Sequence, residues 1–295
     1  MSFKTMKVFP SSEGVVWKHV FDFGDAIAET VLYRYAARTV ICCSVMCGCP
    51  VGCVFCGTGK RFKRNLTTAE ICLQITHTLD YHGIRADDES RFQIMFMSMG
   101  EPMLNWPNVD MAIKLLNITF PTAELLISTV GINDPDAIRG IIETSRKINK
   151  VRLQLSIHDA FDDDRNALIP FKNKLSLRRI RDFGSQWNIY TGRPVYLNYC
   201  IDKPMDAARK ARMIDLFSPL VFNLTFSVIC SADETMKDAA HRELDAVHAT
   251  AAAFAEAGYS VRVFDPAGQD DIGGGCGQLW YTQEWFERMK GSAAA

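Results

Sequence analysis

The feature that most constrains this chain is a stretch rich in cysteine and glycine between residues 42 and 64. It holds six of the ten cysteines of the 295-residue chain, namely Cys42, Cys43, Cys47, Cys49, Cys53 and Cys56. The last three form a C-x3-C-x2-C triplet, with Phe55 just before the final cysteine. Three thiolates on one tight loop can hold three irons of a cubic iron–sulfur cluster and leave a fourth iron open. The triplet therefore predicts a cluster site, with the Phe55 ring beside whatever binds the open iron.

Zinc binding, disulfide bonding and core packing each account less well for these cysteines. A zinc site usually needs two cysteine or histidine pairs, and the sequence has no second CxxC or HxxxH partner. A disulfide network is not expected from ten cysteines in 295 residues without a signal peptide. Single cysteines are common in protein cores, but they rarely gather among glycines as they do here.

Composition narrows the class of protein. Hydrophobic residues make up 48% of the chain and charged residues 23%, as in a globular protein with a large core. No apolar run reaches the length of a membrane span. The net charge of −1 counts mildly against a large phosphate-rich partner. Reduced cysteines and an N-terminus without a signal-peptide core indicate the cytoplasm.

Strand-sized apolar runs alternate with amphipathic segments along most of the chain. Expected strands cover 39–45, 92–97, 125–129, 151–157, 195–201, 222–229 and 259–264, and expected helices cover 67–79, 109–116, 136–147, 177–186, 205–217 and 238–258. Doubly buried strands separated by helices form parallel βαβ units. We therefore expect an α/β fold built on a partial (β/α)6 TIM-like barrel at 39–265. Residues 1–38 would form a β-rich extension, 266–290 a C-terminal strand, glycine-rich cysteine loop and helix, and 291–295 a disordered tail.

Barrels of this kind place their chemistry at the carboxyl ends of their strands. The first expected strand ends in the cysteine stretch, and the next three end in Met99–Pro102, Ser128–Gly131 and Ser156–Asp159. Each end taken alone is typical of a plain turn between a strand and a helix. Their recurrence at the same edge predicts a rim that binds a ligand.

These segments resemble a known family. The matching residues are Glu29-Thr30-Val31, Cys42 seven residues before Cys49, Arg64-Asn65-Leu66-Thr67, MGEPMLN at 99–105, STVGI at 128–132, LSIHD at 155–159, Arg165 with Ile169-Pro170, and GGGCGQL at 273–279. The cysteine triplet alone resembles the radical S-adenosylmethionine (SAM) superfamily. With Glu29, Cys42 and Cys276 at these spacings, the chain resembles the RNA adenine C2/C8 methyltransferases, the RlmN/Cfr group, over most of its length.

The resemblance implies two cofactors and their ligands. Cys49, Cys53 and Cys56 would hold a 4Fe-4S cluster whose open iron binds the amino and carboxylate groups of SAM. Glu101 would accept a hydrogen bond from the SAM amino group, and Gly100 would let the backbone approach it. Ser128 and Ser156 would contact the SAM ribose or carboxylate. An external electron donor of the flavodoxin or ferredoxin type would reduce the cluster, and the SAM cofactor would then yield a 5′-deoxyadenosyl radical.

The resemblance also implies a set of catalytic residues. Cys276 matches the cysteine that carries a methyl group to an sp2 carbon, and Cys42 matches the thiol that releases the product by forming a disulfide with it. Glu29 matches a carboxylate that assists proton removal from the substrate carbon. Cys276 lies among glycines, which suits a mobile loop better than a packed core. Cys43 is an alternative to Cys42, because only one of two successive strand residues points inward.

Three departures from the family leave the substrate open. The family carries an N-terminal accessory domain, whereas this chain begins almost at the matching region, so we expect that domain to be missing. Val228 stands where the family has a SAM-contacting Asn, and Ser227 could replace it. The basic run at 60–64 could meet RNA phosphates or form a solvated loop. RNA is therefore the expected substrate, a nucleotide, nucleoside or other small molecule is the first alternative, and a non-catalytic iron–sulfur protein is the second.

Overall fold

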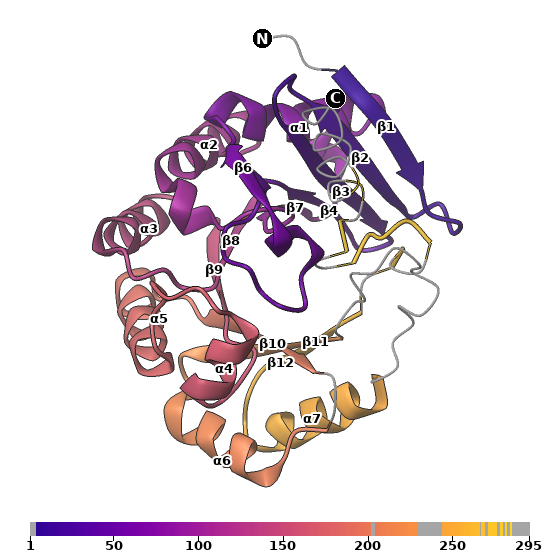
Figure 1. Ribbon diagram of the computed structural model, residues 1–295. Coiled ribbons are helices and arrows are strands. Elements are labelled where there is room, and N and C mark those ends of the chain that lie inside the picture. Colours follow the sequence, from indigo (N-terminus) through magenta and orange to yellow (C-terminus); the bar gives the residue numbers. More distant parts are fainter. Residues whose placement is uncertain are drawn as a thin grey trace, which may run out of the picture.

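The computed structural model describes residues 4–201, 204–228, 244–265, 267–268, 271–275, 278–279, 281 and 284. Within these residues the centre of the protein is a sheet with the order β1-β2-β3-β4-β7-β8-β9-β10-β11-β12 (Figure 1). The strands are β1 (Lys4–Pro10), β2 (Val16–Asp22), β3 (Ile27–Tyr35), β4 (Arg38–Cys43), β7 (Phe92–Phe96), β8 (Glu124–Thr129), β9 (Val151–Ser156), β10 (Val195–Ile201), β11 (Phe222–Val228) and β12 (Val261–Phe264). A separate pair, β5 (Met46–Gly48) and β6 (Phe62–Asn65), is antiparallel.

Strand direction divides the large sheet into two parts. The strands from β4 to β12 are all parallel, whereas β1 to β4 pair antiparallel. The described residues contain no pairing that joins β12 back to β4, so the curved sheet stays open on one side. The prediction of a partial α/β barrel with a β-rich extension is confirmed.

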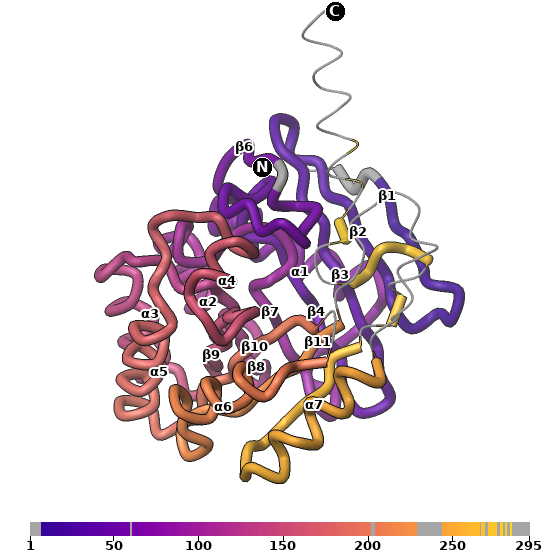
Figure 2. The backbone as a smooth tube through the Cα atoms, turned by 60° about the horizontal axis from the view of Figure 1, so that its bottom comes forward, coloured from indigo at the N-terminus to yellow at the C-terminus, as the bar shows by residue number. Residues whose placement is uncertain are grey.

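Helices cover the outside of the parallel strands (Figures 1 and 2). They are α1 (Thr68–Tyr81), α2 (Trp106–Thr119), α3 (Pro135–Lys147), α4 (Asp162–Leu168), α5 (Leu177–Thr191), α6 (Ala207–Leu216) and α7 (Leu244–Glu256), with short 3₁₀ turns η1 (Gly57–Lys60), η2 (Ala86–Asp88) and η3 (Pro102–Asn105). The helix α2 begins before the expected Val109, because Pro107 fits the first turn of a helix. The helix α4 was not predicted from the sequence. Its three aspartates look like loop residues, yet they suit the positive end of a helix.

The start of α1 shows how local sequence fixes an element. Thr67 caps the helix by accepting from the Glu70 backbone N–H, and the Glu70 side chain accepts from the Thr67 backbone N–H. Arg64 then joins Glu70 and Asp25 through hydrogen bonds of 2.8 and 2.7 Å. Arg64, part of the basic run considered for phosphate binding, thus has a structural role between β6, α1 and the β2–β3 turn.

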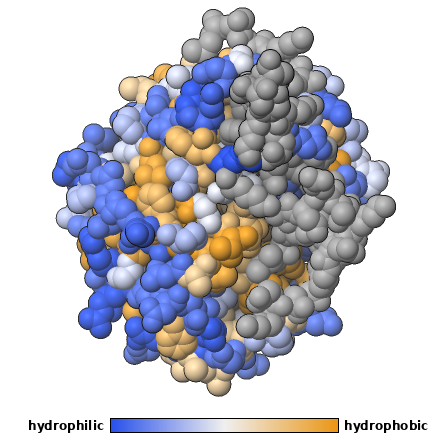
Figure 3. All heavy atoms as spheres, in the orientation of Figure 1, coloured by the Kyte–Doolittle hydropathy of each residue, from blue (hydrophilic) through white to orange (hydrophobic). Residues whose placement is uncertain are grey.

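The face that carries the cysteine loop is partly hydrophobic. Figure 3 shows hydrophobic side chains in the middle of this face, with hydrophilic residues over the outer helices. Two of the exposed hydrophobic residues, Val54 and Phe62, belong to that loop region. Among the described residues, every helix is too short or too polar to traverse a lipid bilayer.

The outer face of β2 carries a buried histidine that we expect to control the pH dependence of stability. His19 is fully buried, its Nε2 lies 2.9 Å from that of His82, and burial together with His82 and His77 lowers the pKa of His19 to about 3. Between pH 6.5 and 3 the unfolded chain therefore binds a proton that the folded chain excludes. The free energy of unfolding should fall by about 1.4 kcal/mol per pH unit as the pH drops below 6.5.

Chemical denaturation at several pH values measures this slope. His19→Phe, which suits the surrounding aromatic rings, should reduce the slope by the share of His19 and leave that of His158, whose pKa burial also lowers to about 3. His248→Gln, at an exposed position of α7, should leave the slope unchanged. Equal slopes in the wild type and His19→Phe would contradict the prediction.

Candidate active site

The cysteine triplet lies on a loop that is closed at its base by β5 and β6. Cys47 pairs with Arg64 across the two strands, and the Cys49 N–H donates to the Arg61 carbonyl at 2.7 Å. Gly48 has a φ of +76°, and a Cβ placed on it would lie 2.1 Å from the Arg61 carbonyl oxygen. Glycine is therefore required at this crossing of the two chain segments. The loop is fixed at its base, and the Val54 N–H also ties its middle to the Leu168 carbonyl at 3.0 Å.

One cavity gathers most of the predicted cofactor residues. We call it the cysteine-loop cavity, and its lining includes Cys49, Cys53, Phe55, Cys56, Gly100, Glu101, Ser128, Thr129, Ser156, His158, Asn198, Cys200 and Val228. The carboxyl ends of the first parallel strands thus meet at one rim, as the strand-end pattern predicted.

The three thiols have the chemistry of cluster ligands. Cys49, Cys53 and Cys56 form no disulfide. Burial raises the pKa of Cys49 to about 12, with the neighbouring anions Cys56 and Glu101 acting in the same direction. Burial likewise raises the pKa of Cys53. Thiolates in such a setting need a positive partner, and iron supplies one.

The number and kind of ligands on this loop match those of a cubic cluster. Among the described residues, no three His, Cys, Asp or Glu side chains converge on a position for a single metal ion. A cubic cluster takes one thiolate per iron, so its ligands stand further apart than the ligands of one zinc ion. The triplet therefore fits a 4Fe-4S cluster.

Glu101 is a buried carboxylate with one side still available. Its oxygens accept from the Val130 N–H at 2.9 Å, the Met103 N–H at 3.0 Å and the Thr129 hydroxyl. Burial nevertheless raises the pKa of Glu101. A carboxylate has about four lone-pair positions, so the three donors leave room for one from a ligand amine. The geometry agrees with the expected contact to the SAM amino group.

Gly100 is required for a reason that the sequence did not show. Its φ is +97°, and a Cβ would lie 2.6 Å from the Met46 side chain. The Glu101 N–H also points at the Met46 sulfur, at 3.5 Å. Because residue 100 is glycine, the segment that follows β7 can pack directly on the base of the cysteine loop. This packing is a separate reason for glycine from the predicted approach of the backbone to SAM.

Arg165 of α4 holds two strand ends in place. Its fully buried guanidinium donates to the carbonyls of Val130 at 2.7 Å, Leu175 at 2.9 Å and Ser156 at 3.3 Å. Ser128 and Ser156, the predicted SAM contacts, both belong to strands whose ends are fixed in this way. The Ser128 hydroxyl also accepts from Gln154 at 3.0 Å.

Several cavity residues had no individual role predicted, among them Thr129 and His158 of the predicted rim segments and Asn198 and Cys200 of β10. His158 has a φ of 60°, rare for a residue other than glycine, and its ring packs on Phe55 at 4.8 Å. Its Nδ1 accepts from the Cys200 N–H at 3.2 Å, and burial and the Arg165 charge lower the pKa of His158 to about 3. The available signal was their place at strand ends, since each is polar where barrel interiors usually carry aliphatic residues.

Val228 and Ser227, the two residues considered for the position of the family's SAM-contacting Asn, line different cavities. Val228 lines the cysteine-loop cavity. The Ser227 hydroxyl lines another space inside the barrel together with Thr225, and it donates to Asn198 Oδ1 at 2.7 Å. Ser227 therefore lies in a neighbouring cavity, and its direct contact with SAM stays an untested prediction.

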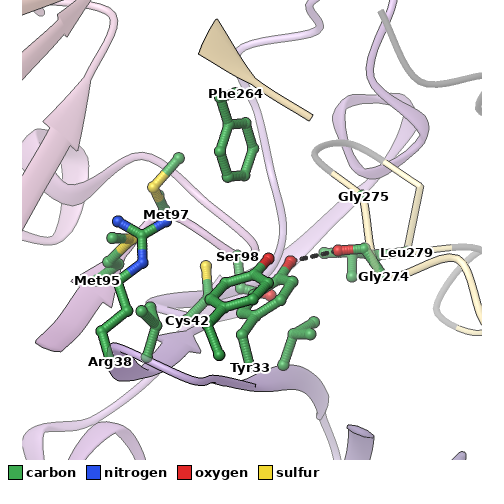
Figure 4. Close-up of a pocket in the computed structure, with 13 residues that line it drawn as sticks. Tyr33, Arg38, Cys42, Met95, Met97, Ser98, Phe264, Gly274, Gly275 and Leu279 are labelled. Atoms are coloured by element: carbon green, nitrogen blue, oxygen red, sulfur yellow. Dashed lines mark hydrogen bonds between the residues drawn. The ribbon is translucent and has the colours of Figure 1, made fainter. Parts of the chain in front are cut away.

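Cys42 lies in a second cavity, the Cys42 cavity (Figure 4). Tyr33, Met97, Ser98, Phe264 and Gly274 are among the residues around it. Met97 and Ser98 also line the cysteine-loop cavity, so the two spaces adjoin. Cys43 is fully buried on the other face of β4. The structure thus brings Cys42, and not Cys43, to this space.

The glycine-rich segment near the C-terminus reaches the same cavity. Gly274, Gly275 and Leu279 line it, and the Tyr33 hydroxyl donates to the Gly274 carbonyl (Figure 4). The Gly274 N–H in turn donates to the Gly268 carbonyl at 3.0 Å. Cys276 itself lies outside the described residues, so its predicted role stays a prediction.

Glu29 lies next to the Cys42 cavity without lining it. Its carboxylate is fully buried and 3.1 Å from the equally buried Lys18 ammonium. The Glu29 carbonyl accepts from the Ser98 hydroxyl at 2.7 Å, and Val31, on the same face of β3, lines the cavity. Burial lowers the pKa of Lys18. The sequence did not predict this pair, because Lys18 and Glu29 meet only through the register of β2 and β3.

Known proteins share both the sequence pattern and the fold. The family described as the radical SAM superfamily matches residues 43–194. "Probable dual-specificity RNA methyltransferase RlmN" of Chlorobium phaeobacteroides is 36% identical over 64% of this chain and 53% of that protein. The protein of the same name from Thermus thermophilus is 34% identical over 72% of this chain and 59% of its own length. This chain thus spans less than two thirds of the length of these relatives.

A solved structure extends the comparison to the fold. A radical SAM methyltransferase from Sphaerobacter thermophilus has a TM-score of 0.79 at 24% identity, over 94% of this chain and 80% of that one. The family match, over more than half of the chain, together with the cysteine-loop cavity shows that this chain belongs to the radical SAM superfamily. Its cofactors are accordingly a 4Fe-4S cluster and SAM.

The Lys18–Glu29 pair gives a direct test of what holds this region together. Removing one partner of a buried ion pair leaves an uncompensated charge, so Lys18→Met should lower the free energy of unfolding by about 3–5 kcal/mol. The double variant Lys18→Met, Glu29→Leu should recover most of that loss. Chemical denaturation measures both.

The exposed pair Arg34–Glu89, at 3.4 Å, provides the matched control. Breaking it with Arg34→Met should cost about 0–1 kcal/mol. A Lys18→Met variant as stable as Arg34→Met would show that the buried pair contributes nothing.

Proposed function

We propose that the protein is a radical SAM methyltransferase that uses Cys276 as a methyl carrier and methylates an sp2 carbon, C2 or C8 of adenine, in RNA. The observation that carries this proposal is the adjacency of two cavities. Cys42 and the glycines just before residue 276 line one of them, and it shares Met97 and Ser98 with the cysteine-loop cavity. A carrier thiol and a resolving thiol are needed beside the cofactors, and the positions of Cys42, Gly274 and Gly275 support these roles for Cys276 and Cys42.

The protein's own residues have separable tasks. With cluster and SAM bound, the cofactors supply a 5′-deoxyadenosyl radical. Cys49, Cys53 and Cys56 hold the cluster as thiolates, and Glu101 orients SAM with its remaining lone pair. The half-buried Cys42 thiolate attacks the Cys276 sulfur, so that an S–S bond forms as the bond from that sulfur to the product carbon breaks.

Glu29 would take the proton from the substrate carbon. Its position beside the Cys42 cavity supports this role, and the Lys18 Nζ lies 3.1 Å from its carboxylate. Because Glu29 is fully buried, the β2–β3 layer must shift before its carboxylate can reach a substrate.

The substrate class rests on the relatives, whose names specify RNA. The net charge of −1 indicates that any RNA contact is local rather than spread over the surface. An external flavodoxin- or ferredoxin-type donor would supply electrons. A cytoplasmic location is part of the proposal, because thiols and an iron–sulfur cluster persist best in a reducing compartment.

Methylation of Cys276 is the direct test of the chemistry. Anaerobically reconstituted protein incubated with methyl-labelled SAM should carry one label on the Cys276 peptide by mass spectrometry. Cys276→Ser should remove the label, whereas Cys72→Ser, at a half-buried thiol of α1, should keep it. An unlabelled Cys276 would contradict the carrier role. Absence of 5′-deoxyadenosine with SAM and dithionite would favour a non-catalytic iron–sulfur protein instead.

The substrate class has its own test. We expect methyl transfer to rRNA or tRNA, with an affinity that falls steeply as salt rises because phosphate contacts release counterions. Each neutralised phosphate of a single strand should contribute about 0.7 to the slope of log K against log salt. Transfer to a free nucleotide or nucleoside, with no measurable RNA binding, would move the assignment to a small molecule.

A further inference from the structure

A third cavity lies deeper in the barrel, and we call it the inner cavity. It shares Arg38, Met95, Met97 and Phe264 with the Cys42 cavity. The interiors of parallel barrels are normally filled by aliphatic side chains. Here buried polar side chains from three neighbouring strands face the space, among them Gln154, Asn198, Thr225 and Ser227. Such a wall is built to contact a polar ligand.

Two arginines face each other across the inner cavity. Arg38 is the first residue of β4 and Arg262 is the second residue of β12, the two strands at the ends of the parallel part of the sheet. They meet because the sheet curves and remains open between these strands. Figure 4 shows the Arg38 guanidinium beside Met97, on the cavity that Cys42 and Phe264 also line.

The described residues give these arginines little neutralising charge. Arg38 contacts the Tyr35 ring at 5.3 Å and makes no ion pair with a described carboxylate. Arg262 lies over the Tyr196 ring at 4.7 Å, its Nη2 is 3.4 Å from the Thr225 hydroxyl, and its Nε is buried without a hydrogen-bond partner. Burial and the Arg38 charge lower the pKa of Arg262.

The nearby carboxylate is already engaged. Glu124 accepts from Arg91 at 2.7 Å and from Gln93 at 2.5 Å, and Arg152 lies 3.9 Å away. Arg91, Arg152 and Arg262 therefore share the charge of Glu124, and the charge of Arg38 adds to that of Arg262. This local excess of positive charge would be neutralised by a bound anion.

We propose that Arg38 and Arg262 form a subsite for a phosphate group of the substrate. The planar guanidinium group binds phosphate through paired hydrogen bonds, which suits both side chains to this role. The proposal deepens the proposed function and rests on it only for the identity of the substrate as a nucleotide unit.

The neighbouring Cys42 cavity fits the rest of such a ligand. Tyr33, Tyr35 and Phe264 offer aromatic surfaces, and Met95 and Met97 offer polarisable thioethers. A flat base could lie there beside Cys42 while its phosphate reaches Arg38, because both cavities share that arginine. The subsite would thus set which carbon of the base faces the thiol. The phosphate could belong to a free mononucleotide or to an RNA chain.

Calorimetric titration of reconstituted protein tests the subsite, with excess SAM present so that its own site is filled. We expect AMP to bind at least about tenfold more tightly than adenosine, since charged hydrogen bonds contribute on this scale. Arg38→Gln and Arg262→Gln should each remove most of that difference and leave adenosine binding unchanged. Arg139→Gln, on an exposed face of α3, should change neither. Equal binding of AMP and adenosine by the wild type would overturn the subsite.

Two further measurements keep the outcomes distinct. Inorganic phosphate should raise the unfolding temperature of the wild type but not that of the double variant, and Arg38→Gln alone suffices if Arg262→Gln does not fold. A short RNA that binds more tightly than AMP with the same arginine dependence assigns the phosphate to RNA, and equal affinities assign it to a mononucleotide. If AMP binding depends on the two arginines but Cys276 carries no label, the proposed function is contradicted and the phosphate subsite is supported. If Cys276 carries the label but AMP binding does not depend on the arginines, the proposed function is supported and the subsite is contradicted.

Discussion

The close contact between Gly100 and Met46 is the constraint on which the site depends. A side chain at Gly100 would lie 2.6 Å from Met46, so the end of β7 and the base of the cysteine loop can pack only because glycine is there. Asn105 extends the junction by donating to the carbonyls of Val45 and Leu66, both at 2.8 Å. This junction places the cysteine triplet and Glu101 in one cavity. Without it, each would remain on a separate loop.

The polar groups inside the barrel differ between the carboxyl ends and the amino ends of the parallel strands. At the carboxyl ends of the strands, the buried thiols and Glu101 offer sulfur and oxygen ligands that suit the irons of a cluster and the amine of SAM. At the amino ends, Arg38 and Arg262 form a cationic wall. Met97 lines all three cavities between these ends. A polar, divided interior replaces the aliphatic filling of an ordinary barrel, which is what a reaction inside the barrel requires.

Sequence periodicity predicted the strands and most helices because both faces of the parallel strands are buried and each leaves a continuous apolar run. It missed α4, whose aspartates carry no apolar period. Spacing predicted the cysteine triplet, and the strand-end pattern predicted Glu101, Ser128 and Ser156, since all lie at the same end of consecutive strands. Residues such as His158 and Cys200 escaped prediction because their neighbours come from other strands.

The sequence by itself determined the strand–helix alternation and the ligand triplet, because these depend on spacing along one short segment. Only the tertiary structure decided that Cys42 rather than Cys43 reaches a cavity, that Glu29 pairs with Lys18, and that Ser227 points away from Val228. Each of these depends on strand register, where a shift of one residue turns a side chain to the opposite face. Register is set by contacts between distant segments, so no local pattern contains it.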